Sequence, residues 1–223
     1  MFVNAILLAG GLSKRMGVEF SKVFYEHNGK AIVRYSFDLL AKSNQIKNII
    51  VVCPKTMQHY FPKSTVFAPP GQERFLSVEN GLKKIENDLP FALVHDGARP
   101  LLTLKDVNNL IEIGCNSDGA ALAGRVKNSL MRVSSTNAVK AIIPRDNIWE
   151  TYTPQIGKVT HLLEAISKAK KLRVTPTDEM TLLHGLGLSP KLVEASFPNI
   201  KITYPQDLPL VLDFLDKLHE GSA

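Results

Sequence analysis

A glycine-rich turn early in the chain carries the residue types that bind phosphate. Residues 3–8 form an apolar run that leads into Ala9-Gly10-Gly11-Leu12-Ser13-Lys14-Arg15-Met16-Gly17, and Lys22 follows. Because glycine has no Cβ, backbone N–H groups can approach phosphate oxygens, while Arg15 and Lys22 supply positive charge. The segment predicts a phosphate-binding loop at the carboxyl end of a strand, where open α/β sheets bind ligands. A tight turn with solvated basic side chains is the alternative.

Two other phosphate-binding loops are disfavoured by spacing. The opening segment lacks the third spaced glycine of the G-x-G-x-x-G fingerprint, which argues against a dinucleotide-dependent oxidoreductase. Gly29-Lys30-Ala31 lacks both the hydroxyl residue after the lysine and the upstream glycine of a Walker loop. It indicates a simple turn before a helix.

The composition is typical of a soluble globular protein. The 223 residues are 44% apolar and 22% charged, with a net charge of +6, which favours one domain spanning residues 1–223. The lysines are dispersed, without the basic, aromatic-interleaved block of a nucleic-acid-binding surface, so we expect a small anionic ligand and no nucleic acid. No segment approaches the roughly twenty apolar residues of a membrane span. We therefore expect a cytoplasmic protein with no membrane partner and with Cys53 and Cys115 reduced.

Short apolar runs alternate with longer helical patterns, which predicts an α/β fold with a mostly parallel, Rossmann-like sheet flanked by helices. Strands are expected at residues 3–8, 47–53, 65–68, 91–95, 119–123 and 200–203. Helices are expected at residues 31–43, 74–85, 105–113, 159–171, 178–186 and 205–219. His95, on one of these strands, is expected to be a satisfied core side chain and not a base or ligand.

The pattern changes over residues 127–148. Two β-like runs, 130–133 and 138–143, flank the turn-prone Ser134-Ser135-Thr136-Asn137. A hairpin of this size is not stable alone in water. We therefore expect a protruding β-arm that packs on a second subunit, giving a homodimer.

Further motifs are spread along the chain and resemble those of one family. They are Gly71-Gln72-Glu73-Arg74 with Ser77-Val78 and Gly81-Leu82, Val94-His95-Asp96-Gly97-Ala98-Arg99-Pro100, Thr153-Pro154-Gln155, Thr177-Asp178-Glu179 and Asn199-Ile200-Lys201-Ile202-Thr203. The opening loop resembles that of the nucleotidyltransferase superfamily. Together with the H-D-x-A-R-P, T-D-E and N-I-K-I-T runs, it is similar to the 2-C-methyl-D-erythritol 4-phosphate cytidylyltransferases of the non-mevalonate isoprenoid pathway.

The resemblance implies roles for individual residues. The catalytic cations on the nucleotide phosphates would be Arg15, Lys22 and Lys201. The nucleotide would be bound by Ala9, Gly10, Gly11, Gly71, Ser77 and Asp96, with Gly71 and Ser77 at the cytosine base. The sugar-alcohol phosphate would be bound by Asp96, Arg99, Ser129, Arg145, Thr153 and Thr177, with Ser129 and Arg145 reaching the neighbouring subunit's site. Thr177 also fits the N-cap of a helix.

The implied reaction transfers CMP from CTP to the acceptor phosphate. A phosphate-monoester oxygen attacks the α-phosphorus in line and pyrophosphate leaves. This oxygen is ionised near neutral pH and needs no general base, so catalysis reduces to positioning and electrostatic stabilisation. The implied cofactor is Mg²⁺, which keeps most of its waters and binds substrate phosphates, so no protein metal site is expected.

Two departures from the family pattern concern the loop and the arm. Ser21 precedes Lys22 where the family usually has proline, which predicts a less rigid loop. Asn128-Ser129-Leu130-Met131 replaces the family's D-T-x-K and loses an acid and a base. These departures leave the acceptor less well defined than the reaction.

Two alternatives remain open at this point. A ribitol 5-phosphate cytidylyltransferase shares the opening loop, the H-D-x-x-R-P run and N-I-K-I-T, but Ala98, Arg145 and Thr177-Asp178-Glu179 favour the methylerythritol acceptor. A catalytically silent sugar-nucleotide binding module would not need the three cations Arg15, Lys22 and Lys201.

Overall fold

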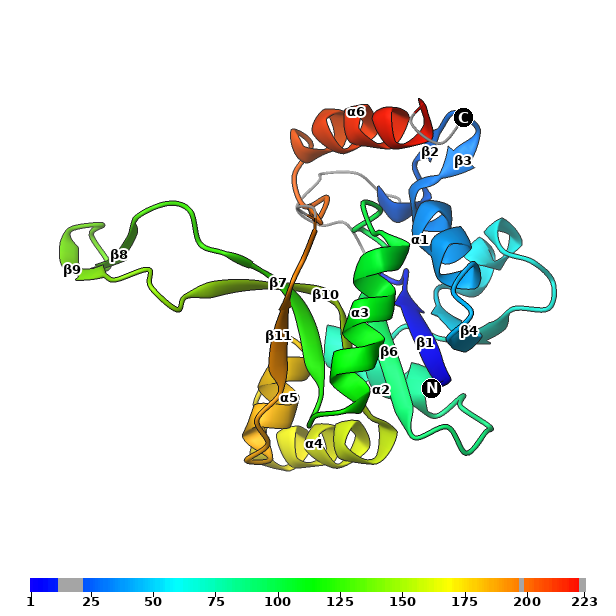
Figure 1. Cartoon of the computed structure of the whole chain (residues 1–223), viewed down its shortest axis with the longest axis horizontal. Helices are drawn as coiled ribbons and strands as arrows, with labels where there is room; N and C mark the ends of the chain where they lie inside the picture. The colour runs from blue at the N-terminus through cyan, green and yellow to red at the C-terminus, as the bar shows by residue number, and fades with distance from the viewer. Residues whose placement is uncertain (12–21, 197–198, 221–223) are drawn as a thin grey trace.

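The fold is that of a mixed sheet flanked by helices, as the sequence pattern predicts. The computed structural model describes residues 1–11, 22–196 and 199–220. The predicted phosphate loop from residue 12 onward, including Arg15, lies outside these residues. Seven strands form one sheet in the order β11-β7-β10-β6-β1-β4-β5 (Figure 1). Its strands are β1 (Val3–Leu8), β4 (Ile46–Val52), β5 (Val66–Ala68), β6 (Phe91–Asp96), β7 (Ala120–Arg125), β10 (Trp149–Lys158) and β11 (Lys191–Glu194).

Most of the sheet is parallel. β1 pairs in parallel with β4 and β6, β4 pairs in parallel with β5, and β7 pairs in parallel with β11. β10 runs antiparallel to both β6 and β7. It enters the sheet from the arm, because the chain leaves β7 for the arm and returns along β10.

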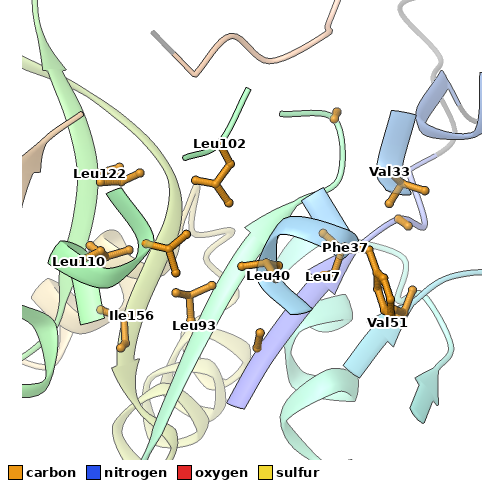
Figure 2. Close-up of a cluster of buried hydrophobic side chains, with 14 of the residues drawn as sticks. Leu7, Val33, Phe37, Leu40, Val51, Leu93, Leu102, Leu110, Leu122 and Ile156 are labelled. Carbon is orange, nitrogen blue, oxygen red and sulfur yellow. The ribbon is translucent and has the colours of Figure 1, made fainter. Parts of the chain in front are cut away.

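Helices cover both faces because alternate strand residues point to opposite sides. On one face, Leu7 and Leu93 pack with α1 (Ile32–Ala41) and α3 (Leu104–Cys115), in the cluster that Figure 2 shows. On the other face, Ile6 and Val94 pack with α2 (Arg74–Leu82), α4 (Val159–Leu172) and α5 (Glu179–Gly185).

A third, smaller cluster lies under the C-terminal helix α6 (Asp207–Glu220). The buried members of this cluster are Ile32, Tyr35, Leu101, Ile202, Val211 and Leu215. Near α6 in Figure 1 are the two short strands β2 (Glu26–His27) and β3 (Lys30–Ala31), which follow the 3-10 turn η2 (Lys22–Phe24). A second 3-10 segment, η3 (Lys55–Tyr60), follows β4.

The arm protrudes from the body as a separate two-stranded ribbon (Figure 1). Its strands β8 (Leu130–Val133) and β9 (Val139–Ile143) pair antiparallel, close to the predicted boundaries. At the base of the arm, Trp149 of β10 pairs with Arg125 of β7, and the Arg125 guanidinium lies 4.5 Å from the centroid of the Trp149 ring. The arm is thus a continuation of the β7–β10 pair.

The prediction of a strand at residues 200–203 is wrong. This segment is irregular, and Ile202 N donates to Ala98 O at 2.9 Å without a ladder around it. Its alternating apolar side chains, Ile200 and Ile202, instead pack beneath α6. An irregular segment that packs beneath a helix can therefore show the same alternation of apolar residues as a strand.

Both cysteines are free thiols, Cys53 buried and Cys115 partly buried. Within the described ranges, no helix has the length and apolarity needed to cross a membrane.

Candidate functional site

The predicted nucleotide-binding residues Ala9 and Gly10 lie at the carboxyl ends of the central strands. Leu8 and Asp96, the last residues of β1 and β6, are register partners. Beyond them Gly97 N donates to Leu8 O at 2.8 Å, and Ala9 N donates to Val52 O at 2.8 Å. The sheet therefore holds the start of the glycine-rich turn at the edge where ligands bind in such folds.

The two loops predicted to bind the nucleotide pack against each other. A Cβ on Gly10 would lie 2.4 Å from Pro70 Cβ, so only glycine fits this approach. A Cβ on Gly71 would lie 2.6 Å from Leu76 Cβ. Ser77 Oγ accepts from Gly71 N at 2.9 Å, which closes the second loop over the first turn of α2. Gly11 is exposed, with nothing near its Cβ position.

A chain of ion pairs runs inward from the strand end. Lys201 Nζ lies 2.6 Å from Asp96 Oδ2, and Arg74 Nε lies 3.0 Å from Asp96 Oδ1. The other edge of the Arg74 guanidinium binds Glu179 through two hydrogen bonds, at 2.7 and 3.1 Å. Positive and negative groups thus alternate across four side chains brought from four different segments.

The charges of Asp96 and Arg74 are stabilised by their partners, whereas burial raises the pKa of Glu179 in spite of Arg74. Burial would raise the pKa of Asp96, but Arg74 and Lys201 outweigh it and hold that pKa well below its usual range. Burial would likewise lower the pKa of Arg74, but Glu179 and Asp96 outweigh it and raise the pKa. Asp96 therefore stays ionised at neutral pH and anchors the Lys201 ammonium group.

Arg99 and Lys201 line a cavity of about 400 Å³, together with Glu150, Thr151, Tyr152, Asn199 and Ile200. Arg99 Nη1 donates to Asn199 O at 2.6 Å, and its guanidinium lies 5.4 Å from the Tyr152 ring centroid. Burial lowers the pKa of Arg99, while Asp96 opposes this effect; an arginine nevertheless remains charged. Arg99 Nε and Asn199 Oδ1 are buried without a hydrogen-bond partner among the described residues. The two cationic side chains that line the cavity, Arg99 and Lys201, are what make it suited to an anion.

Thr153 follows Tyr152 of the cavity wall and is almost fully buried. Its Oγ1 accepts from Asp96 N at 3.0 Å and lies 3.1 Å from His95 Nδ1. His95 Nε2 is 3.1 Å from Arg99 O. Thr153 thus supports the backbone of the predicted acceptor-binding residues, and the His95 ring is satisfied as expected.

Burial lowers the pKa of His95 to about 4, against the opposing charge of Asp96. The ring is therefore neutral at pH 7. This fits a support for the strand end, and not a catalytic base.

Thr177 is exposed beside this region, just before α5. The N-cap of α5 is Asp178, whose side chain accepts from Thr181 N, so the prediction of Thr177 as N-cap is wrong by one residue. Asp178 Oδ2 also accepts from Thr151 Oγ1 at 2.9 Å, and Thr151 lines the cavity. A carboxylate is suited to this position because one oxygen can accept from the backbone amide of the helix while the other accepts from the hydroxyl of Thr151.

The predicted arm residues Ser129 and Arg145 are exposed, and neither is among the residues that line the cavity of their own chain. The Arg145 guanidinium donates to Lys127 O across the base of the arm. Several apolar side chains of the arm are exposed, namely Met131, Val133, Val139 and Ile142.

Sequence reasoning missed the roles of Arg74, Glu179 and Asn199. All three stand inside motifs that drew attention for other residues. A signal was available for Arg74 and Glu179, since a buried aspartate at a strand end needs cationic partners and a buried arginine needs acids. Their pairing joins residues 105 positions apart and could not be read from local spacing.

The described residues contain no group of three or more histidine, cysteine, aspartate or glutamate side chains that could hold a metal ion. Both oxygens of Asp96 are already bound, by Arg74 and Lys201. This donor set suits a Mg²⁺ ion held by substrate phosphate oxygens, since Mg²⁺ is often bound in this way.

Comparison with known proteins adds to this geometry. The sequence model of the 2-C-methyl-D-erythritol 4-phosphate cytidylyltransferase family matches residues 3–216. A protein of that name from Vibrio parahaemolyticus is 33% identical over 223 residues, covering 96% of this chain and 95% of the relative. The crystal structure of one from Thermus thermophilus is 29% identical with a TM-score of 0.79, covering 96% of this chain and 98% of that one. The structure of a 4-diphosphocytidyl-2C-methyl-D-erythritol synthase from Anaerococcus prevotii, at 21% identity and a TM-score of 0.84 over 96% of each chain, shares the fold. The similarity thus spans nearly the whole chain.

Proposed function

The chain belongs to the 2-C-methyl-D-erythritol 4-phosphate cytidylyltransferase family, and we propose that it transfers CMP from CTP to 2-C-methyl-D-erythritol 4-phosphate, releasing pyrophosphate. The observation that carries this proposal is the Lys201–Asp96 ion pair beside a cavity that Arg99 also lines. This arrangement places two cations, Lys201 and Arg99, on the wall of one cavity, which suits a reaction between two phosphate compounds. The names of the relatives favour this acceptor over ribitol 5-phosphate.

In the proposed mechanism the protein positions the two substrates and stabilises charge. Lys22 and Lys201, with Arg15, neutralise the triphosphate as the acceptor oxygen attacks the α-phosphorus. Asp96 is an acid and would repel a phosphate, so its contribution is to hold Lys201 in place and not to bind phosphate directly. Arg99, whose guanidinium lines the cavity, binds the acceptor phosphate.

Gly71 and Ser77 lie at the cytosine base in this proposal. Gly71 N donates to Ser77 Oγ and the Ser77 hydroxyl donates to Glu73 O, so in this proposal the two residues shape the loop against which the base lies. Mg²⁺, carried on the triphosphate, supplies further neutralisation of the phosphate oxygens.

The proposal includes a homodimer built through the arm. Its support is that the arm exposes Met131, Val133, Val139 and Ile142, more apolar surface than a two-stranded ribbon leaves in water without a partner. Ser129 and Arg145 then serve the site of the partner subunit, and Thr177 binds acceptor at the rim.

Pyrophosphate release tests the function. The purified protein is given CTP and Mg²⁺ with either 2-C-methyl-D-erythritol 4-phosphate or ribitol 5-phosphate. Release with the first alone supports the proposal. Release with ribitol 5-phosphate alone keeps the reaction but replaces the acceptor, and release with neither leaves a binding module.

A further inference from the structure

Helix α6 packs against the segment that carries Lys201. Ile200 and Ile202, the neighbours of Lys201, belong to the apolar cluster beneath α6 with Val211 and Leu215 of the helix. Ile202 N also donates to Ala98 O at 2.9 Å. The position of the Lys201 ammonium group therefore depends on how α6 packs against this segment.

The same helix holds the β2–β3 hairpin near its C-terminal end (Figure 1). His27 Nε2 lies 2.7 Å from Asp216 Oδ1, and Asn28 Nδ2 donates to the same oxygen at 3.1 Å. The Tyr35 hydroxyl donates to His27 O at 3.2 Å, so the hairpin is also tied to α1. Burial raises the pKa of Tyr35, and the charge of Asp216 raises it further.

This hairpin follows the 3-10 turn η2, which begins at Lys22. Tyr25 N donates to Lys22 O at 3.2 Å, and Ile32 N donates to Tyr25 O at 2.9 Å. Val23 and Phe24 are buried in the main core. The backbone of Lys22 is thus fixed on one side by the core and by the hairpin that Asp216 holds.

We infer that Asp216 is a positioning residue for the transfer reaction, because α6 uses it to hold the hairpin after Lys22 while its apolar face seats Lys201. One helix then sets the separation of the two lysines that act on the same triphosphate. The inference rests on the proposed function for the roles of Lys22 and Lys201. Displacements of about 1 Å at a reacting centre can cost roughly a hundredfold in rate, so a loosened hairpin is expected to lower kcat.

Three variants of α6 separate positioning from general stability. Asp216→Ala is expected to lower kcat about tenfold. Asp216→Asn keeps an oxygen that accepts from His27 and Asn28, and is expected to restore most of the loss. Asp213→Ala is the matched control, since Asp213 pairs along the helix surface with Lys217 at 2.6 Å, and it should leave kcat unchanged. Equal effects of the two alanine variants would overturn the inference.

A double-mutant cycle tests whether Asp216 acts through Lys22. Asp216→Ala added to Lys22→Ala should cause no further loss of kcat, because the lysine that it positions is gone. A further loss equal to that in the wild-type background contradicts the inference.

Hydrogen exchange makes the test independent of activity. The Tyr25 and Ile32 amides are expected to exchange faster in Asp216→Ala than in Asp213→Ala. Unchanged exchange would refute the link between α6 and the hairpin, even if the wild-type protein transfers CMP. A wild-type protein without transferase activity refutes the proposed function instead, and the exchange result still decides whether Asp216 holds the hairpin.

Discussion

At the scale of single residues, Arg74 is the group on which the buried acids of the site depend. Its guanidinium is the bidentate partner of Glu179, which is fully buried, and it also contacts Asp96. Removing one partner of a buried ion pair leaves a charge that neither water nor protein stabilises. Asp96 would then lose one of the two cations that hold its carboxylate in place, and with it the position that anchors Lys201.

Arg74→Ala is expected to lower the free energy of unfolding by about 3–5 kcal/mol, because it strands Glu179 in the interior. Urea unfolding followed by circular dichroism measures this change. Lys83→Ala is the control: the exposed Lys83 pairs with Glu79 at 2.9 Å, Glu79 keeps Lys170 as a second partner, and surface pairs contribute about 0–1 kcal/mol. Equal losses in the two variants would show that the Arg74 network contributes no more than a surface pair.

A second prediction concerns His95, whose folded pKa is about 4 against an ordinary 6.5. Between pH 6.5 and 4 the imidazole is protonated in the unfolded chain but stays neutral in the folded protein. The contribution of His95 to the free energy of unfolding is therefore complete above pH 6.5 and decreases as the pH falls toward 4. The loss should reach about 3 kcal/mol. His95→Gln should flatten this part of the stability profile, measured by urea unfolding at several pH values. An unchanged slope in the variant would assign the pH dependence to other groups.

Residue pairing was the part of the site that the sequence could not predict. The strand end at Asp96 and the cations Lys201 and Arg99 were identified by motif, and the structure brings them together. The contacts of Arg74 with Glu179 and of Asn199 with Arg99 join distant segments. Such contacts depend on how the sheet and helices pack, which local spacing does not contain.

At the scale of elements, strands and helices were predicted accurately where the apolar pattern of a segment fitted only one type of secondary structure. β1 and β6 are buried on both faces and are therefore recognisable as continuous apolar runs. β10 was missed because Pro154 and Gly157 interrupt its strand pattern. β11 was missed because it is short and has a charged residue at each end.

The N-cap of α5 gives a prediction at this scale. Asp178→Ala removes the oxygen that accepts from Thr181 N and the one that accepts from Thr151 Oγ1. The loss of stability should be about 1 kcal/mol or more, and kcat/KM for the acceptor should fall because Thr151 lines the cavity.

Thr103→Ala is the matched control, since Thr103 caps α3 in the same way through Asp106 N. It should cost similar stability and leave kcat/KM unchanged. Thermal unfolding and initial rates measured on the two variants decide whether the α5 cap also shapes the cavity.

At the scale of the whole molecule, the proposed homodimer gives a prediction about the arm. Ile142→Glu places a charge on a side chain that is 72% exposed within one chain, so folding should be unaffected while the dimer weakens. Sedimentation equilibrium should show a shift toward the mass of one chain. Leu172→Glu changes another exposed apolar residue, at the end of α4, and should leave the mass unchanged. A dimer that survives Ile142→Glu would remove the arm from the interface.

The pairing of Trp149 with Arg125 at the base of the arm has a practical consequence. Trp149 is the single tryptophan of the sequence, and its ring lies under a guanidinium where the ribbon leaves the sheet. Its fluorescence therefore reports on one defined place, without any label. Its emission should therefore change if the arm forms the proposed dimer, and also if substrate enters the cavity, which the next residue, Glu150, helps to line.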